Sequence, residues 1–511
     1  MIYTKNNWTN RYVTYATEPI IPKKRHGKKL SVLVTNYFTA ALMLAISLTL
    51  VIIGAETKGY QISLLGVFLF WSYSMIFGLI AIDELYAYSI MNFLLFVFFL
   101  SRPTISLLYK TNGMIWGNII IKEALLLIFV SEVALFAGAV LVKQDSRADV
   151  LQIKKTANYN EMVQRTLLVV VLITAVLCAY SAMRNYFHFA SLAYEELYVS
   201  SGLHDNVVIR ASVTLFPYLV FAYLATIPSK RNSIMILLIY VALGVPMFLL
   251  GNRTSIVLRI AFAVVYFFMR DYTTGIYTQR WISRSLRIVF IFFVVGAVGI
   301  LGALNYYRAG LNPNNETTIP ILLDFFYRQG TTFDTICQGL LHQDSIMKLP
   351  QNVPYSIGQL YDTVKHSTLS QIILDTGSLG SGNSIKMVLE GNNLAHKLSY
   401  VVLGETSYLA GFGRGSSYVL ELYYDGGLLL VAVFSLAMGV YLASFNRIIQ
   451  MGKWFLNTIV LTSLSKVFFM PRASAFDFMT FIFTPHFWLI IFIVVVILSF
   501  SNDEMEKNKN T

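Results

Sequence analysis

Long apolar runs alternate with short polar stretches along the chain from Ser31 onwards. A helix that crosses a membrane needs about 20 mostly apolar residues to cover a hydrocarbon core of about 30 Å. About twelve runs approach that length, so the pattern predicts an all-α polytopic membrane protein with about twelve transmembrane helices. The expected helices are 31–54, 61–82, 85–101, 118–142, 166–184, 209–227, 233–250, 254–269, 285–304, 427–445, 455–470 and 478–500.

Lysine and arginine gather in alternate stretches between these runs. The tail at 1–30 is basic, and so are the stretches around Lys143, Lys230, Arg270 and Arg447. Because cytoplasmic loops carry an excess of basic residues, we expect both termini in the cytoplasm. The expected organisation is a cytoplasmic tail at 1–30, nine helices at 31–304, an extracytoplasmic loop at 305–426, three helices at 427–500 and a cytoplasmic tail at 501–511.

The loop at 305–426 is far longer than the ~15 residues beyond which a loop is usually functional or disordered. It contains an amphipathic stretch, Ile319–Leu341, and a turn region rich in Gly, Ser and Asn, Gly377–Asn383. A third stretch, Tyr400–Tyr424, is rich in glycine and aromatic residues. We therefore expect two or three short helices that lie on the outer leaflet or dip into it.

The amino-acid composition narrows the class of protein further. Of 511 residues, 56% are hydrophobic and 13% are charged, whereas soluble domains carry about a quarter charged residues. The net charge of +12 is divided among separate loops, so we expect no nucleic acid partner. Only Cys178 and Cys337 supply thiols, and no Cys/His spacing typical of a metal site occurs. No metal or cofactor is expected. The first run is long for a signal peptide and is predicted to be a retained helix.

Six arginines fall on the outer side, where the positive-inside rule predicts few. An arginine presents a planar fork of donors that matches a phosphate, and a neighbouring glycine lets a bulky anion approach the backbone. Each arginine alone could extend to lipid headgroups; together they indicate one diphosphate site that needs no metal. The six are Arg184, Arg253, Arg308, Arg328, Arg414 and Arg472.

Candidate acids and bases leave the chemistry open. Glu421 and Asp425 lie four residues apart and share one face if the tenth helix starts early. One of them could deprotonate a sugar hydroxyl, or both could pair with the arginines. The ionisable residues inside predicted helices, Glu132, Arg259 and Lys466, are either functional or paired between helices. The remaining outer candidates are His342, His366, His396 and Glu405.

Three short motifs resemble one family. The stretch Leu409–Gly427, which reads LAGFGRGSSYVLELYYDGG, resembles the late motif of the Wzy-type polymerases that join bacterial O-antigen and exopolysaccharide repeat units. Gly251-Asn252-Arg253 and Met470-Pro471-Arg472-Ala473-Ser474 are similar to further parts of that family. The plan of about a dozen helices with one large late outer loop also matches.

This resemblance implies a metal-independent membrane glycosyltransferase at the outer face of the bacterial plasma membrane. Such an enzyme transfers a growing glycan from an undecaprenyl diphosphate carrier onto the next lipid-linked repeat unit. The partners implied are membrane lipid, a chain-length regulator and a flippase of the same pathway. As catalytic residues we expect Arg253, Arg308, Arg328, Arg472 and Glu421, and as substrate-binding residues Arg414, Ser416, Ser417, Tyr424, Asp425 and Arg184.

Three alternatives remain. A ligase that moves the finished glycan to another acceptor, such as an O-antigen ligase, would carry similar arginines and a similar loop. A lipid-linked oligosaccharide flippase also has about twelve helices, but transporters usually show two related halves with broken helices near the midplane. We find no such repeat. A membrane scaffold or sensor would leave the outer arginines unexplained.

Overall fold

The computed structural model describes residues 37–111, 114–142, 161–190, 206–250, 253–274, 281, 319–380 and 382–507. Within these ranges the chain is helical and contains no strand, which confirms the predicted all-α class. The chain divides into two units, Met1–Leu42 and Met43–Thr511. The first unit is described only where helix α2 (Tyr37–Glu56) begins, and the outer helices and the candidate site lie entirely within the second.

Eight helices of the described ranges are long and apolar enough to cross a membrane, so the chain is a polytopic membrane protein. A ninth crossing results if η4 (Asp477–Phe483) and the helix after it, which bend by 59°, form one span. The eight lie in α2, α3 (Gln61–Ile80), α4–η1–α5 (Ile82–Leu95, Phe96–Leu100, Ser101–Tyr109), α6 (Asn118–Leu141), α8 (Glu161–Phe189), α10 (Val207–Ala225), α11–α12 (Lys230–Ala242, Val245–Leu249) and α24 (Tyr418–Ala443).

Four of the predicted spans are not among these eight helices. The run at 254–269 lies in α13 (Arg253–Thr274), and the run at 455–470 is divided between α26 (Trp454–Val467) and the 3-10 turn η3 (Met470–Arg472). The run at 285–304 lies outside the described residues. The final run corresponds to η4 and α27 (Pro485–Lys507).

Helix α24 begins at Tyr418, nine residues before the predicted start at Gly427. The helix kinks where Gly426 and Gly427 leave helical geometry. Gly427 has φ +62° and ψ −157°, a conformation that is essentially restricted to glycine. The part of α24 before the kink is therefore helical, although it falls within the predicted loop at 305–426.

Small residues let α24 pack closely on α6. A Cβ atom at Gly138 would lie 2.1 Å from the carbonyl oxygen of Leu436, and one at Gly439 would lie 2.1 Å from that of Leu135. Such close approach is typical of small residues at helix interfaces in membranes. The Ser131 hydroxyl also lies 2.6 Å from the hydroxyl of Tyr418. This pairing holds α24 in the membrane part of the fold.

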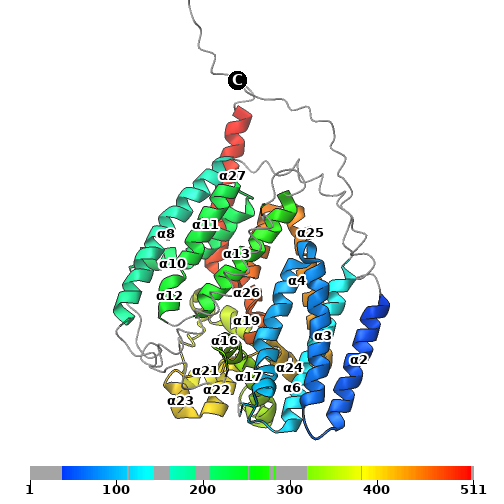
Figure 1. The fold of residues 1–511 in the computed structure, drawn as a ribbon. Helices are drawn as coiled ribbons and strands as arrows, with labels where there is room; N and C mark the ends of the chain where they lie inside the picture. The colour runs from blue at the N-terminus through cyan, green and yellow to red at the C-terminus, as the bar shows by residue number, and fades with distance from the viewer. Residues whose placement is uncertain are drawn as a thin grey trace, which may run out of the picture. The chain divides into compact units, whose positions relative to one another are not determined.

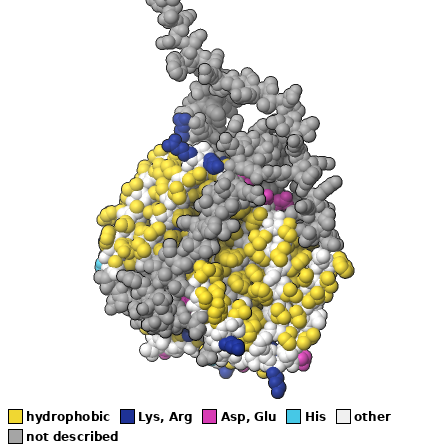
Figure 2. Space-filling view, in the orientation of Figure 1, with side chains coloured by type: hydrophobic (Ala, Val, Ile, Leu, Met, Phe, Trp, Pro, Cys, Tyr) yellow, Lys and Arg dark blue, Asp and Glu magenta, His cyan; other side chains and the backbone are white. Residues whose placement is uncertain are grey.

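The outer helices gather at one end of the second unit, the lower end in Figure 1, whereas α25 (Phe445–Gln450) and the end of α27 lie at the other. On the face shown in Figure 2, hydrophobic side chains cover the helices between these ends. The outer helices are α16 (Ile321–Gln329), α17 (Thr331–Leu341), α18 (Gln343–Met347), α19 (Tyr355–Lys365), α20 (Thr368–Leu374), α21 (Ile385–Leu389), α22 (Leu394–Leu403) and α23 (Glu405–Leu409).

The outer half of α24 anchors these helices. Asp425 accepts hydrogen bonds from the backbone N–H groups of Tyr355 and Ser356, each at 2.7 Å. A carboxylate at the start of α19 also interacts favourably with the helix dipole. The Tyr424 hydroxyl donates to the carbonyl oxygen of Gly339 at 2.6 Å. One helix thus connects the membrane part of the fold with α17 and α19.

Candidate functional site

Four arginines meet at one short segment, residues 324–335, which contains the turn between α16 and α17: Arg328 belongs to the segment, and the other three contact it, Arg414 through its backbone. We call the four the arginine cluster. They come from distant parts of the chain: α5, α16, the loop before α24, and η3. The segment lies in the outer region, at the lower end in Figure 1. The members are Arg102, Arg328, Arg414 and Arg472.

Arg102 is held between the two outer helices. Its Nε atom lies 2.7 Å from Oδ2 of Asp334, and its guanidinium group lies 4.5 Å from the ring centroid of Tyr327. A glycine at the turn permits this approach, because a Cβ atom at Gly330 would lie 2.6 Å from Cβ of Arg102. An ion pair and a cation–π contact therefore fix the Arg102 guanidinium at the turn.

Arg328 and Arg472 meet the last turn of α16. Arg328 Nε lies 2.7 Å from Oδ2 of Asp324, one helical turn earlier, and the Arg328 side chain is 46% exposed. Arg472 Nη1 donates to Oε1 of Gln329 at 3.5 Å. Both guanidinium groups are thus oriented by polar neighbours on α16.

Arg414 is fixed through its backbone. Its N–H donates to the hydroxyl of Ser399 at 2.9 Å, and its carbonyl oxygen accepts from the hydroxyl of Thr335 at 3.1 Å. Gly411 and Gly415 on either side have φ +94° and +76°, values that favour glycine. The glycine-rich motif therefore folds as a loop that presents an exposed Arg414 side chain beside α17.

Positive charge exceeds negative charge at this site. Burial raises the pKa of Asp334, while Arg102, the Trp116 N–H bond and Arg414 act to lower it. Arg102 and Arg328 pair with Asp334 and Asp324, and Arg414 and Arg472 complete the cluster. These six side chains carry a net charge of +2 (4 − 2) when both carboxylates are ionised. That balance suits a bound anion.

Glu421 joins the two arginine-bearing motifs. Its side chain is fully buried, and Oε1 accepts from the hydroxyls of Ser416 at 2.7 Å and Ser474 at 2.8 Å. Its Oε2 accepts from the backbone N–H of Ala475 at 2.9 Å. Ser416 lies two residues after Arg414, and Ser474 two residues after Arg472. The carboxylate thereby fixes the spacing between the segments that carry these two arginines.

The other predicted substrate-binding residues of this region differ in their contacts. Ser417 precedes α24 and is buried, and its hydroxyl has no hydrogen-bond partner among the described residues. Tyr424 and Asp425 use their polar atoms to anchor α17 and α19. Arg184 lies in α8, which packs against α10, α12 and α27, none of which carries a member of the arginine cluster.

Two predicted arginines cannot be placed relative to the cluster. Arg253 is the first residue of α13, but its side chain lies outside the described part of the structure. Arg308 lies outside the described residues altogether.

Arg102 is the member of the cluster that the sequence reasoning missed. A signal was present, because Arg102 directly follows the third apolar run on the side where the positive-inside rule predicts few arginines. It belongs to no motif of the resembled family. Among the described residues, no group of three or more His, Cys, Asp or Glu side chains could hold a metal ion.

Comparison with known families decides the identity of the chain. The family model for O-antigen polysaccharide polymerase Wzy matches residues 38–504, which include every member of the arginine cluster. The chain belongs to the Wzy family. The resemblance seen in the sequence is thereby confirmed, and the ligase and flippase alternatives are not favoured.

As a Wzy-family member, the chain is a multi-pass membrane polymerase that joins lipid-linked oligosaccharide repeat units in O-antigen synthesis by a glycosyltransferase-type reaction. No curated protein and no solved structure gives a significant match to it.

Proposed function

We propose that the arginine cluster binds the diphosphate of an undecaprenyl-diphosphate-linked glycan donor. The observation that supports this proposal is the convergence of Arg102, Arg414 and Arg472, from distant segments, on residues 324–335, which carry Arg328. Guanidinium groups can contact phosphate oxygens bidentately. Two carboxylates, Asp324 and Asp334, form ion pairs with members of the cluster, so the cluster retains positive charge for an anionic ligand.

The chemistry requires no metal in this proposal. As the bond between the anomeric carbon and the diphosphate oxygen breaks, negative charge grows on the leaving diphosphate, and the guanidinium groups stabilise it. A base of the outer region takes the proton of the acceptor hydroxyl. The outer helices keep water away from the activated sugar. Glu421 is a positioning residue, because its buried oxygens bind Ser416, Ser474 and Ala475.

The outer placement of this site is part of the same proposal. We infer that the arginine cluster faces the extracytoplasmic side of the bacterial plasma membrane and that both termini are cytoplasmic. Arg253 and Arg308 are proposed further ligands of the diphosphate, and Arg184 a proposed contact of the glycan. A chain-length regulator and a flippase of the same pathway are the proposed protein partners.

Replacement of single arginines by lysine tests the diphosphate role. Arg328→Lys, Arg414→Lys and Arg472→Lys keep the charge but lose the planar fork, and each lost charge-assisted contact is worth about 1.5–3 kcal/mol. We expect polymerisation of lipid-linked repeat units to slow by about 10- to 100-fold per variant. The measurement is the rate with purified protein, together with the chain length of surface glycan in cells.

The matched control is Arg447→Lys in α25, at the opposite end of the second unit. It should polymerise at the normal rate. Normal rates in all three cluster variants would contradict the proposed role.

A further inference from the structure

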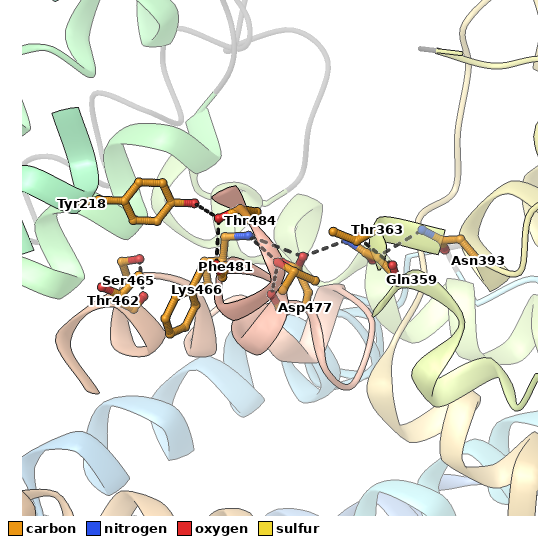
Figure 3. A network of polar contacts seen from close by, with 11 residues as sticks. Tyr218, Gln359, Thr363, Asn393, Thr462, Ser465, Lys466, Asp477, Phe481 and Thr484 are labelled. Atoms are coloured by element: carbon orange, nitrogen blue, oxygen red, sulfur yellow. Dashed lines mark hydrogen bonds and ion pairs between the residues drawn. The ribbon is translucent and has the colours of Figure 1, made fainter. Parts of the chain in front are cut away.

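A second polar group shares a chain segment with the arginine cluster. It consists of Lys466 on α26, Asp477 on η4 and Gln359 on α19, and we call it the Lys466 group. Lys466 Nζ lies 3.6 Å from Oδ1 of Asp477 and donates to the hydroxyl of Thr480 at 3.0 Å. Gln359 Nε2 donates to the same Oδ1 at 2.8 Å (Figure 3). Three elements therefore meet at one carboxylate.

Further polar contacts extend this group in two directions. Asn393 Nδ2 donates to Oε1 of Gln359 at 3.4 Å, towards α22. In the other direction, the hydroxyl of Tyr218 on α10 lies 3.5 Å from that of Thr484, just after η4 (Figure 3). The polar groups thus form a line from the outer helices to a helix that spans the membrane.

The Lys466 group keeps unused hydrogen-bonding capacity. An ammonium group has three donors and an amide nitrogen has two, whereas Lys466 contacts Asp477 and Thr480 and Gln359 Nε2 donates once. Oδ2 of Asp477 has no hydrogen-bond partner among the described residues. The side chains of Lys466 and Asp477 are 40% and 22% exposed. These partly exposed charges are therefore accessible to a polar ligand.

The chemistry of the group selects a saccharide rather than a phosphate. A hydroxyl is both donor and acceptor, so neighbouring sugar hydroxyls can donate to the free Asp477 oxygen and accept from Lys466 and Gln359. A phosphate can donate nothing when fully ionised and would be repelled by Asp477. The carboxylate therefore distinguishes this group from the arginine cluster, where guanidinium groups dominate.

The short segment from Arg472 to Asp477 limits the distance between the arginine cluster and the Lys466 group. Asp477 follows Arg472 by five residues, and five residues span at most about 18 Å even when fully extended. A polymerase must hold two glycans at once, one on the departing carrier and one that receives it. We propose that Lys466, Asp477 and Gln359 bind hydroxyl groups of the acceptor repeat unit. This proposal rests on the polymerase activity and not on the diphosphate role of the arginine cluster.

The test is direct binding of a saccharide to the purified full-length chain in lipid nanodiscs. The probe is the repeat-unit oligosaccharide of the host strain, released from its lipid and phosphate, and calorimetry measures its dissociation constant. Lys466→Met and Asp477→Asn should each weaken binding at least tenfold. Binding within twofold of the wild type in both variants overturns the proposal, and so does a wild type that does not bind this saccharide.

Two control variants show whether a loss of saccharide binding is specific to the Lys466 group. Lys386→Met breaks an exposed lysine–glutamate pair on α21, where Lys386 Nζ lies 3.7 Å from Oε2 of Glu390, and should leave binding unchanged. Arg472→Lys should also leave saccharide binding unchanged while it weakens binding of a short prenyl diphosphate. If prenyl diphosphate binding is unaffected by Arg472→Lys, the arginine proposal fails and the saccharide proposal stands.

Exchanging the charges of Lys466 and Asp477 tests whether this ion pair has only a structural role. The double variant Lys466→Asp with Asp477→Lys keeps opposite charges together, so its unfolding temperature should stay near that of the wild type while saccharide binding is lost. Normal saccharide binding in this folded double variant overturns the proposal. If the charge variants do not fold, Gln359→Met, which retains both ions, should still weaken binding at least tenfold, and normal binding there overturns the proposal equally.

Discussion

Individual carboxylates and amides of the outer region orient the arginines of the cluster. Asp334 and Asp324 fix Arg102 and Arg328 at 2.7 Å, and Gln329 contacts Arg472. Glu421 acts one step further away, because it binds the segments that carry Arg414 and Arg472 rather than the arginines themselves. A buried carboxylate with several donors is costly to disturb, since every lost partner leaves a buried polar group unsatisfied.

Glu421→Gln is therefore expected to lower stability and polymerisation together. The amide oxygen of the glutamine can still accept hydrogen bonds from the hydroxyls of Ser416 and Ser474. In that orientation the NH₂ group faces the backbone N–H of Ala475, and two donors oppose each other. Loss of this buried contact costs about 1–3 kcal/mol, which a thermal unfolding scan would detect beside the polymerisation assay. Full loss of activity at an unchanged unfolding temperature would instead favour the role of general base. Glu405→Gln on α23, an exposed carboxylate of the outer region, is the control.

At this scale the sequence predicted residue types better than contacts. Arg328, Arg414 and Arg472 were selected because arginine is unusual on the outer side, and all three contact residues 324–335. Hydropathy and charge alone cannot show that Arg102 approaches the same turn, since that approach depends on the absence of a side chain at Gly330. Nor can they show that Asp425 is used to anchor α19.

Among the elements, the approach of α5 to the turn between α16 and α17 decides where Arg102 lies. The π-helical turn η1, Phe96–Leu100, immediately precedes α5 within one long helix. Such turns often occur at functional sites, where the extra residue changes the direction in which the following side chains point. At the other side of the contact, Gly330 ends α16 and begins α17.

Gly330→Ala should separate these elements and reduce polymerisation. The added Cβ would lie 2.6 Å from both Cβ of Arg102 and Oγ of Ser101, and such overpacking typically costs about 1–3 kcal/mol. We expect a lower unfolding temperature and at least a tenfold lower polymerisation rate. Gly117→Ala is the matched control, because a Cβ there meets no atom within 4 Å. Equal behaviour of the two variants would show that this approach is unimportant.

The start of α24 shows that hydropathy alone does not predict where this helix begins. The predicted start at Gly427 followed from the position where the apolar run begins. The structure continues the helix on both sides of the kink, from Tyr418 to Ala443. Contacts of Tyr424 and Asp425 with the outer helices stabilise the part before the kink, and such tertiary contacts cannot be derived from a run of apolar residues.

For the molecule as a whole, the proposed topology places the helices of residues 321–409 outside the plasma membrane and both termini in the cytoplasm. Cysteine labelling tests the assignment of the two sides. The two native cysteines, Cys178 and Cys337, are buried, so background labelling should be low. We expect Ser378→Cys, in the outer turn region, to react with an impermeant maleimide in right-side-out vesicles.

Met451→Cys supplies the opposite position in this experiment. Met451 is 50% exposed and lies between α25 and α26, so its cysteine should react only after the vesicles are permeabilised. The reverse pattern of labelling would invert the proposed topology and place the arginine cluster in the cytoplasm.

The dispersal of the arginine cluster along the chain has a consequence for biosynthesis. Arg102 enters the membrane with the first helices, whereas Arg472 belongs to the segment between the last two. A ribosome-bound nascent chain therefore inserts most of its helices before all the proposed pyrophosphate ligands are present. A truncated translation product that lacks η3 should therefore have no polymerase activity, even when it is stably inserted in the membrane.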